Sequence, residues 1–144
     1  MPTTSFYPVL MTDDIPAATA FYRDILGFTT TFTADWYTSL RLGSYELALL
    51  DPEHATVPHG YGTRAAGLLL NLETDDATAL HTRLTRSHGI EPVLGLRDED
   101  FGQRHFIIEG PGGVLIDIIE PIAPSPEFAA AYSPDALPRS GGSS

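Results

Sequence analysis

Two stretches of the chain show the same order of hydrophobic and polar positions. In both, an apolar run leads into Thr-Asp-Asp and then into a helical pattern that stops at a glycine. The second Asp and the glycine are Asp14 and Gly27 in the first stretch and Asp76 and Gly89 in the second, 13 residues apart each time (27 − 14 and 89 − 76). The shared order and spacing predict an internal repeat.

The helical patterns have physical start and stop signals. Apolar residues recur at three- and four-residue spacing and form one stripe on each helix. The aspartates before each pattern (Asp13 and Asp14 in the first, Asp75 or Asp76 in the second) can accept hydrogen bonds from the first free N–H groups, and the glycines can take the left-handed conformation that ends a helix. The stripes consist of Ala18, Phe21, Tyr22 and Ile25, and of Ala77, Leu80 and Leu84.

Three strand-like segments follow each helix, so the predicted unit is strand, helix and three strands, present twice. We expect one structural domain with modules at 1–50 and 67–122, an irregular linker at 51–66 and a Pro-rich tail at 123–144. In the tail, a short helix from residue 125 to 132 and disorder at 140–144 are expected. The expected strands are 28–33, 36–42, 45–50, 91–96, 104–109 and 114–119.

Composition narrows the possible functions. The chain has 144 residues, a formal net charge of −11 and no Lys, which makes nucleic-acid binding a poor hypothesis. It has no Cys, so disulfides, thiolate metal sites and a cysteine nucleophile are excluded. No signal-peptide pattern or long apolar run is present, so we expect a cytoplasmic protein without membrane contact.

Several motifs resemble the vicinal oxygen chelate superfamily of glyoxalase I, bleomycin- and fosfomycin-resistance proteins and extradiol dioxygenases. They are Ala20-Phe21-Tyr22-Arg23-Asp24 followed by Leu26-Gly27-Phe28, and the glycine turn 109–113 followed by Ile116-Asp117-Ile118. The resemblance covers roughly residues 6–122. It implies an α+β fold of two βαβββ modules forming an open, cup-shaped mixed sheet, a ligand inside the cup, and a homodimer.

The resemblance also bears on metals. Metal-dependent members take ligands from the first strand of each module, commonly His, and from the last strand, commonly Glu. Here Tyr7 and Leu69 stand where the histidines would be, and Glu46 and Asp117 remain on the last strands, at positions that we expect to match. We therefore expect no metal or other cofactor; the alternative is a weakly bound divalent metal on Glu46 and Asp117.

The other candidate site residues are aromatic or lie at the start of a strand. Trp36 and Tyr37, with Tyr7 and Phe32 nearby, would offer flat stacking surfaces. Of Arg104 and His105, only one can face the cup, because adjacent strand residues alternate; Arg104 is expected to pair with a carboxylate, and His105 is the best candidate for a general base. The proposed ligand-binding set is Tyr7, Phe32, Trp36, Tyr37, Glu46, Leu69, Arg104, His105 and Asp117.

The sequence favours a metal-free binding protein that sequesters a small organic molecule, such as an antibiotic or natural product, in an aromatic, acidic cup. Whether the protein is an enzyme stays open. The first alternative is a lyase, isomerase, dioxygenase or tailoring enzyme that uses a weak divalent metal, or His105 or a carboxylate as its base. The second is an interaction module whose cup is filled by its own side chains.

Overall fold

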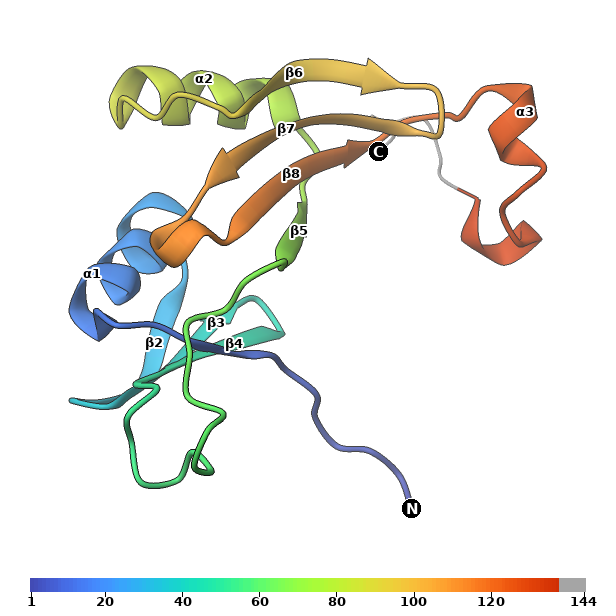
Figure 1. The fold of residues 1–144 in the computed structure, drawn as a ribbon. Helices are drawn as coiled ribbons and strands as arrows, with labels where there is room; N and C mark the ends of the chain where they lie inside the picture. The colour runs from blue at the N-terminus through green and yellow to red at the C-terminus, as the bar shows by residue number, and fades with distance from the viewer. Residues whose placement is uncertain (138–144) are drawn as a thin grey trace. The chain divides into compact units, whose positions relative to one another are not determined.

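A computed structural model describes residues 1–137, so the disorder expected at 140–144 lies outside the described residues. The chain divides into two compact units. Unit 1 comprises Met1–Leu68 with Gly110–Val114, and unit 2 comprises Leu69–Glu109 with the residues from Leu115 onward. Each unit is described by itself below, and Figure 1 shows the path of the chain through both.

Unit 1 contains β1 (Val9–Met11), α1 (Ile15–Ala20), the π-helical turn η1 (Phe21–Ile25), β2 (Thr29–Ala34), β3 (Tyr37–Leu42) and β4 (Tyr45–Leu50). Its strands form a sheet in the order β1-β4-β3-β2, hereafter sheet A. β1 runs parallel to β4, and the other neighbours are antiparallel. The 3-10 turn η2 (Pro111–Gly113) also belongs to unit 1.

Local chemistry starts and ends the first helix. The Asp14 Oδ1 accepts a hydrogen bond from the Ala17 amide at 3.0 Å, and Gly27 follows the helix at a φ of +81°, a conformation in which a side chain is strained. The helix packs on one face of sheet A, where the Thr19 hydroxyl donates to the Thr38 hydroxyl at 3.2 Å. The buried apolar side chains of this layer are Leu10, Ile15, Ala18, Tyr22, Leu26, Leu40, Leu47 and Leu49.

Unit 2 repeats this arrangement with β5 (Leu69–Glu73), α2 (Ala77–Ser87), β6 (Leu94–Glu99), β7 (Gln103–Glu109) and β8 (Leu115–Pro121). The strands form a sheet in the order β5-β8-β7-β6, hereafter sheet B, with β5 parallel to β8. Two short elements follow, α3 (Pro126–Ala129) and the 3-10 turn η3 (Pro134–Ala136). Figure 1 shows α2 as the long helix of this unit.

The second helix is capped as the first is. The Asp76 Oδ1 accepts from the Ala79 amide at 2.9 Å, so Asp76 rather than Asp75 is the N-cap. The Glu120 Oε1 accepts from the Ala77 amide at 3.1 Å, and the Phe106 ring meets the His81 ring edge to face. Phe106 and Glu120 therefore lie on the face of sheet B that α2 covers.

The predicted α+β class and the two βαβββ modules are confirmed, and both sheets are open. One strand was placed wrongly, because β6 spans Leu94–Glu99 rather than 91–96. The charged end of β6 pairs with β7, and Arg97 lies opposite His105. In the sequence such a charged run looks like a loop, and for this reason the strand was predicted too early. The expected tail helix is shorter, Pro126–Ala129, and residues 51–66 contain neither helix nor strand.

None of the helices within residues 1–137 has the length and apolar run that crossing a bilayer would need.

Candidate ligand-binding faces

Sheet A has one face covered by α1 and one face that α1 leaves open. Thr38 faces α1 through its bond to Thr19, so its neighbours Tyr37 and Ser39 point to the open face. Their β4 partners are Leu50 and Ala48, and the next pair on this face is Arg41 with Glu46. The strand alternation therefore places an aromatic ring, a hydroxyl, a guanidinium and a carboxylate on a single face.

Three of the predicted aromatic residues gather there. Phe32 is paired with Ser39, and its ring centroid lies 6.1 Å from that of Tyr37. Burial raises the pKa of Tyr37 above its ordinary value, and the adjacent Tyr7 phenol raises it further. The side chains of Phe32 and Tyr7 remain 52% and 42% exposed, so both rings are open to a ligand.

Glu46 contributes the acidic group of this face. Its Oε2 accepts a hydrogen bond from the Ser5 hydroxyl at 2.7 Å, and its charge contributes to the raised pKa of Tyr37. The guanidinium of Arg41, on the opposite strand, forms no ion pair or hydrogen bond within the part of the chain that the structure describes. The face therefore carries one carboxylate and one cation that are not paired with each other.

Trp36 lies beside this face in the turn between β2 and β3. Its ring stacks on the His54 imidazole with centroids 3.7 Å apart and planes 9° from parallel. The Trp36 ring is also 5.5 Å from the Tyr37 ring. One side of the indole is thus covered by His54 of the 51–66 segment, and Trp36 contacts the open face by way of the Tyr37 ring.

Sheet B carries a hydrogen-bonded cluster on the face opposite α2. His105 neighbours Phe106, which faces α2, so His105 points the other way, as does Asp117, the ladder partner of Ile107. The His105 Nδ1 lies 2.7 Å from the Asp117 Oδ1, and its Nε2 lies 2.8 Å from the Glu99 Oε2. The Arg97 Nε donates to the same Glu99 oxygen at 2.7 Å.

The cluster favours the protonated form of the imidazole. Burial acts to lower the pKa of His105, but the hydrogen bonds to Glu99 and Asp117 outweigh it, so the pKa is raised above 6.5. The pKa of the Glu99 carboxyl is lowered, first by His105 and then by Arg97. An imidazolium donates through both nitrogens, so a base role for His105 would require one carboxylate to leave.

The remaining predicted residues lie apart from these groups or form other contacts. Arg104 lies on the α2 side of sheet B, where its Nε donates to the Asp98 Oδ1 at 2.8 Å and its Nη1 is 3.6 Å from the Glu120 Oε2. This is the carboxylate pairing expected for Arg104. Leu69 is paired with Leu115 at the start of β5 and is 41% exposed.

The ladder registers correct one expectation about the repeat. Counting five residues back from Asp14 and Asp76 gives Val9 and Asn71, whose parallel partners are Ala48 and Asp117. The partner position of Asp117 in the first module is therefore Ala48, and Glu46 corresponds to Leu115. Glu46 and Asp117 are two residues out of step and do not occupy matching places.

The donor set does not fit the metal centre that the superfamily implies. Leu69 offers only hydrocarbon, and the Asp117 carboxylate is already hydrogen-bonded to His105. Within residues 1–137, no cluster of three or more His, Asp or Glu side chains has a geometry that could hold a metal ion. The alternative of a metal held by Glu46 and Asp117 assumed that the two carboxylates occupy matching positions in the two modules, and the ladder registers show that they do not.

Sequence reasoning missed four polar members of the two faces. Ser39 and Arg41 follow Tyr37 at every second position, so strict strand alternation would have found both. Glu99 and Arg97 lie in the charged run whose strand register was hidden, and no local signal marks them.

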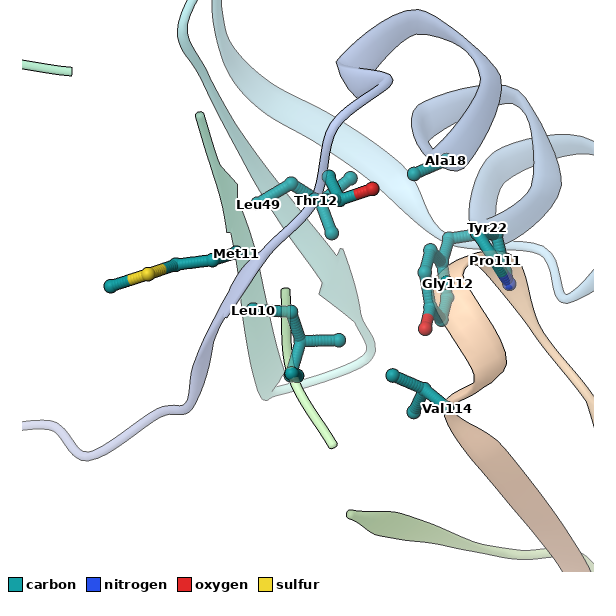
Figure 2. A pocket seen from close by; sticks show the side chains of 10 residues that line it. Leu10, Met11, Thr12, Ala18, Tyr22, Leu49, Pro111, Gly112 and Val114 are labelled. Atoms are coloured by element: carbon teal, nitrogen blue, oxygen red, sulfur yellow. The ribbon is translucent and has the colours of Figure 1, made fainter. Parts of the chain in front are cut away.

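Unit 1 also contains a small cavity of about 10 Å³ beneath sheet A. Figure 2 shows the Tyr22 ring beside Gly112, with its hydroxyl turned toward the end of the cavity lined by Val114. The hydroxyl is buried and has no hydrogen-bond partner among the described residues, and burial raises the pKa of Tyr22 to about 12. The lining residues are Leu10, Met11, Thr12, Ala18, Tyr22, Leu49, Ala65, Pro111, Gly112 and Val114.

Three solved structures show the same fold. A lactoylglutathione lyase from Agrobacterium tumefaciens is 22% identical with a TM-score of 0.67, covering 83% of this chain and 96% of its own. The bleomycin resistance determinant encoded on transposon Tn5 is 22% identical with a TM-score of 0.62, covering 83% and 98%. The bleomycin-binding protein of Streptomyces verticillus, complexed with copper(II)-bleomycin, is 23% identical with a TM-score of 0.54, covering 82% and 96%.

No curated protein sequence matches the chain. The sequence model of one family matches residues 5–118, a range that includes both βαβββ modules up to β8. The two βαβββ modules agree with this match, which identifies the chain as a member of the Glyoxalase/Bleomycin resistance protein/Dioxygenase superfamily.

Proposed function

We propose that the chain is a metal-free binding protein that sequesters a small organic molecule, an antibiotic or another natural product, on the open face of sheet A. The observation that carries the proposal is the convergence of Tyr7, Phe32 and Tyr37 with the Glu46 carboxylate on one uncovered face. Aromatic faces attract cations, and a carboxylate strengthens that preference.

The state of His105 favours binding over catalysis. Both of its ring nitrogens are within hydrogen-bond distance of carboxylates, and these contacts raise its pKa. A general base needs a free nitrogen within reach of the proton that it removes. The enzyme alternative therefore depends on an opening of this cluster, whereas ligand binding on sheet A does not.

The comparison with bleomycin-binding proteins supports the kind of ligand. The Streptomyces verticillus protein is described with copper(II)-bleomycin, and the Tn5 protein as a bleomycin resistance determinant. At 22–23% identity these proteins share the fold with our chain, and a ligand of that class is part of the proposal. We also propose a homodimer located in the cytoplasm, as the resemblance and the composition suggested.

Native mass spectrometry of the purified protein tests the proposal directly, because it reports bound metal, co-purified ligand and subunit number together. We expect a dimer without metal. Titration with bleomycin and with a cationic aromatic probe, 2-phenylethylamine, should then shift backbone amide resonances of β3 and β4. Glu46→Gln should weaken binding of the amine by about fivefold, while the matched control Glu91→Gln, at an exposed residue outside both sheets, should not.

Two results would overturn the proposal. One is a stoichiometric metal whose removal abolishes a measured turnover. The other is the absence of any shift on sheet A with both probes, which would favour a face filled by the protein's own side chains.

A further inference from the structure

The edge of the open face of sheet A carries an unusual pair of charges. Arg41 on β3 and Glu46 on β4 are directly opposite each other in the antiparallel ladder, where side chains start about 5 Å apart and opposite charges normally pair. No ion pair joins them within the described residues. Glu46 is instead held by the Ser5 hydroxyl at 2.7 Å, so the guanidinium keeps its donors for another group.

A groove of about 540 Å³ lies at this pair of charges. It is formed by the N-terminal segment Thr4–Phe6 and by the end of the β3–β4 hairpin, including Arg41, Tyr45 and Glu46. Its volume is in the range of small-molecule sites. Phe6, one of the lining residues, is 93% exposed, so an aromatic side chain is available beside the two charges.

We infer that this groove binds a zwitterion that carries an aromatic or other apolar group, of the α-amino-acid or short-peptide class. The ammonium of such a ligand meets Glu46, its carboxylate meets Arg41, and its apolar group lies against Phe6. This inference rests on the proposed function and names the ligand class of the same face.

Charge balance separates this class from the alternatives. A simple cation would satisfy Glu46 but would be repelled by Arg41 and would leave the guanidinium donors unused. A simple anion would meet a chain with a net charge of −11, which disfavours its approach. A zwitterion has no net charge, and its two charges, one carbon apart in an α-amino acid, suit two side chains on adjacent strands.

The test uses three probes that share a phenyl group: L-phenylalanine, 2-phenylethylamine and 3-phenylpropionate. Each is titrated at neutral pH into the full chain, and the backbone amide shifts of Arg41 and Glu46 are followed. We expect L-phenylalanine to bind most tightly. Arg41→Gln should weaken L-phenylalanine by about five- to tenfold and leave 2-phenylethylamine unchanged or tighter, as expected for one lost charge-assisted contact.

The outcomes separate this inference from the proposed function. If 2-phenylethylamine binds at least as tightly as L-phenylalanine, or if Arg41→Gln affects neither, the zwitterion is wrong and binding on sheet A stands. If none of the three probes shifts these amides, the zwitterion inference is wrong, and if bleomycin also causes no shift on sheet A, the proposed function fails with it. Arg41→Lys, which keeps the charge but not the planar fork, should recover part of the L-phenylalanine affinity, and unperturbed spectra of the variants exclude misfolding.

Discussion

Replacing Tyr22 with Phe removes a single hydroxyl from the interior of unit 1. Tyr22 is 1% exposed and lines a cavity of about 10 Å³. Its hydroxyl has no hydrogen-bond partner among the described residues. A buried polar group without a partner costs about 1–3 kcal/mol. We therefore expect Tyr22→Phe to stabilise the protein, against the usual direction of core substitutions.

The size of the gain follows from two opposing terms. Removing the unpaired hydroxyl recovers most of its desolvation cost, while enlarging the cavity by one oxygen costs only a few tenths of a kcal/mol at ~24 cal/mol per Å³. The net expectation is a gain of about 1–2 kcal/mol in the free energy of unfolding. For a chain of this length, that corresponds to a rise in Tm of roughly 3–6 °C.

Urea denaturation followed by far-UV circular dichroism and Trp36 fluorescence measures the change at constant m. Tyr132→Phe is the matched control, because the Tyr132 hydroxyl donates to the Phe101 carbonyl at 2.6 Å; we expect it to lose about 0.5–1.5 kcal/mol. A Tyr22→Phe chain that is less stable at unchanged m would refute the reasoning. It would mean that the hydroxyl has a partner in solution, such as one buried water, for which the cavity is only just large enough.

Other perturbations give equally direct expectations. The folded pKa of Tyr22 is raised from 10 to about 12. The stability that this shift contributes is therefore present below pH 10 and is lost between pH 10 and 12. In urea titrations at different pH values, the parent chain should lose about 1.4 kcal/mol more unfolding free energy by pH 11 than Tyr22→Phe. The folded pKa of His105 is raised, so its contribution is complete below pH 6.5 and is lost as pH rises through the folded value; His105→Gln should remove this slope, and a slope that persists would exclude His105 as its source. Asp76→Ala should cost about 1 kcal/mol of unfolding free energy through the lost N-cap bond to Ala79, and a neutral result in thermal melts would contradict the capping argument. Incubation with a chelator should leave both Tm and 2-phenylethylamine affinity unchanged, and a fall in either would indicate a bound metal.

Strong local signals made the modules predictable from sequence. A capping aspartate and a closing glycine mark the two ends of each helix, and alternating apolar residues mark the strands. These signals lie within each segment and can therefore be read from the sequence. The second strand of the second module, β6, failed this test because its end, Arg97 to Glu99, is stabilised by partners on β7 rather than by its own pattern. Propensity within a segment carries no information about such cross-strand pairs.

The candidate site was predictable where it depends on alternation and not where it depends on register. Tyr37 and Glu46 could be assigned to one surface because strand residues alternate. The equivalence of Glu46 and Asp117 could not be judged, because a shift of two residues keeps every side chain on the same face and therefore leaves no trace in the hydrophobic pattern. Only the ladder partners, Ala48 for one module and Asp117 for the other, expose the difference.

From that difference we infer different roles for the two modules. On sheet B, Asp117 and Glu99 are hydrogen-bonded by His105 and Arg97, so the polar groups of that face are satisfied within the protein. On sheet A, the charge opposite Glu46 remains unpaired, and the residue in the place of Asp117 is an alanine. Polar groups that satisfy one another have little left to offer a ligand, whereas an unpaired guanidinium beside a carboxylate and exposed rings gains by binding one. We therefore propose that the polar face of the second module serves stability and that the polar face of the first module serves recognition.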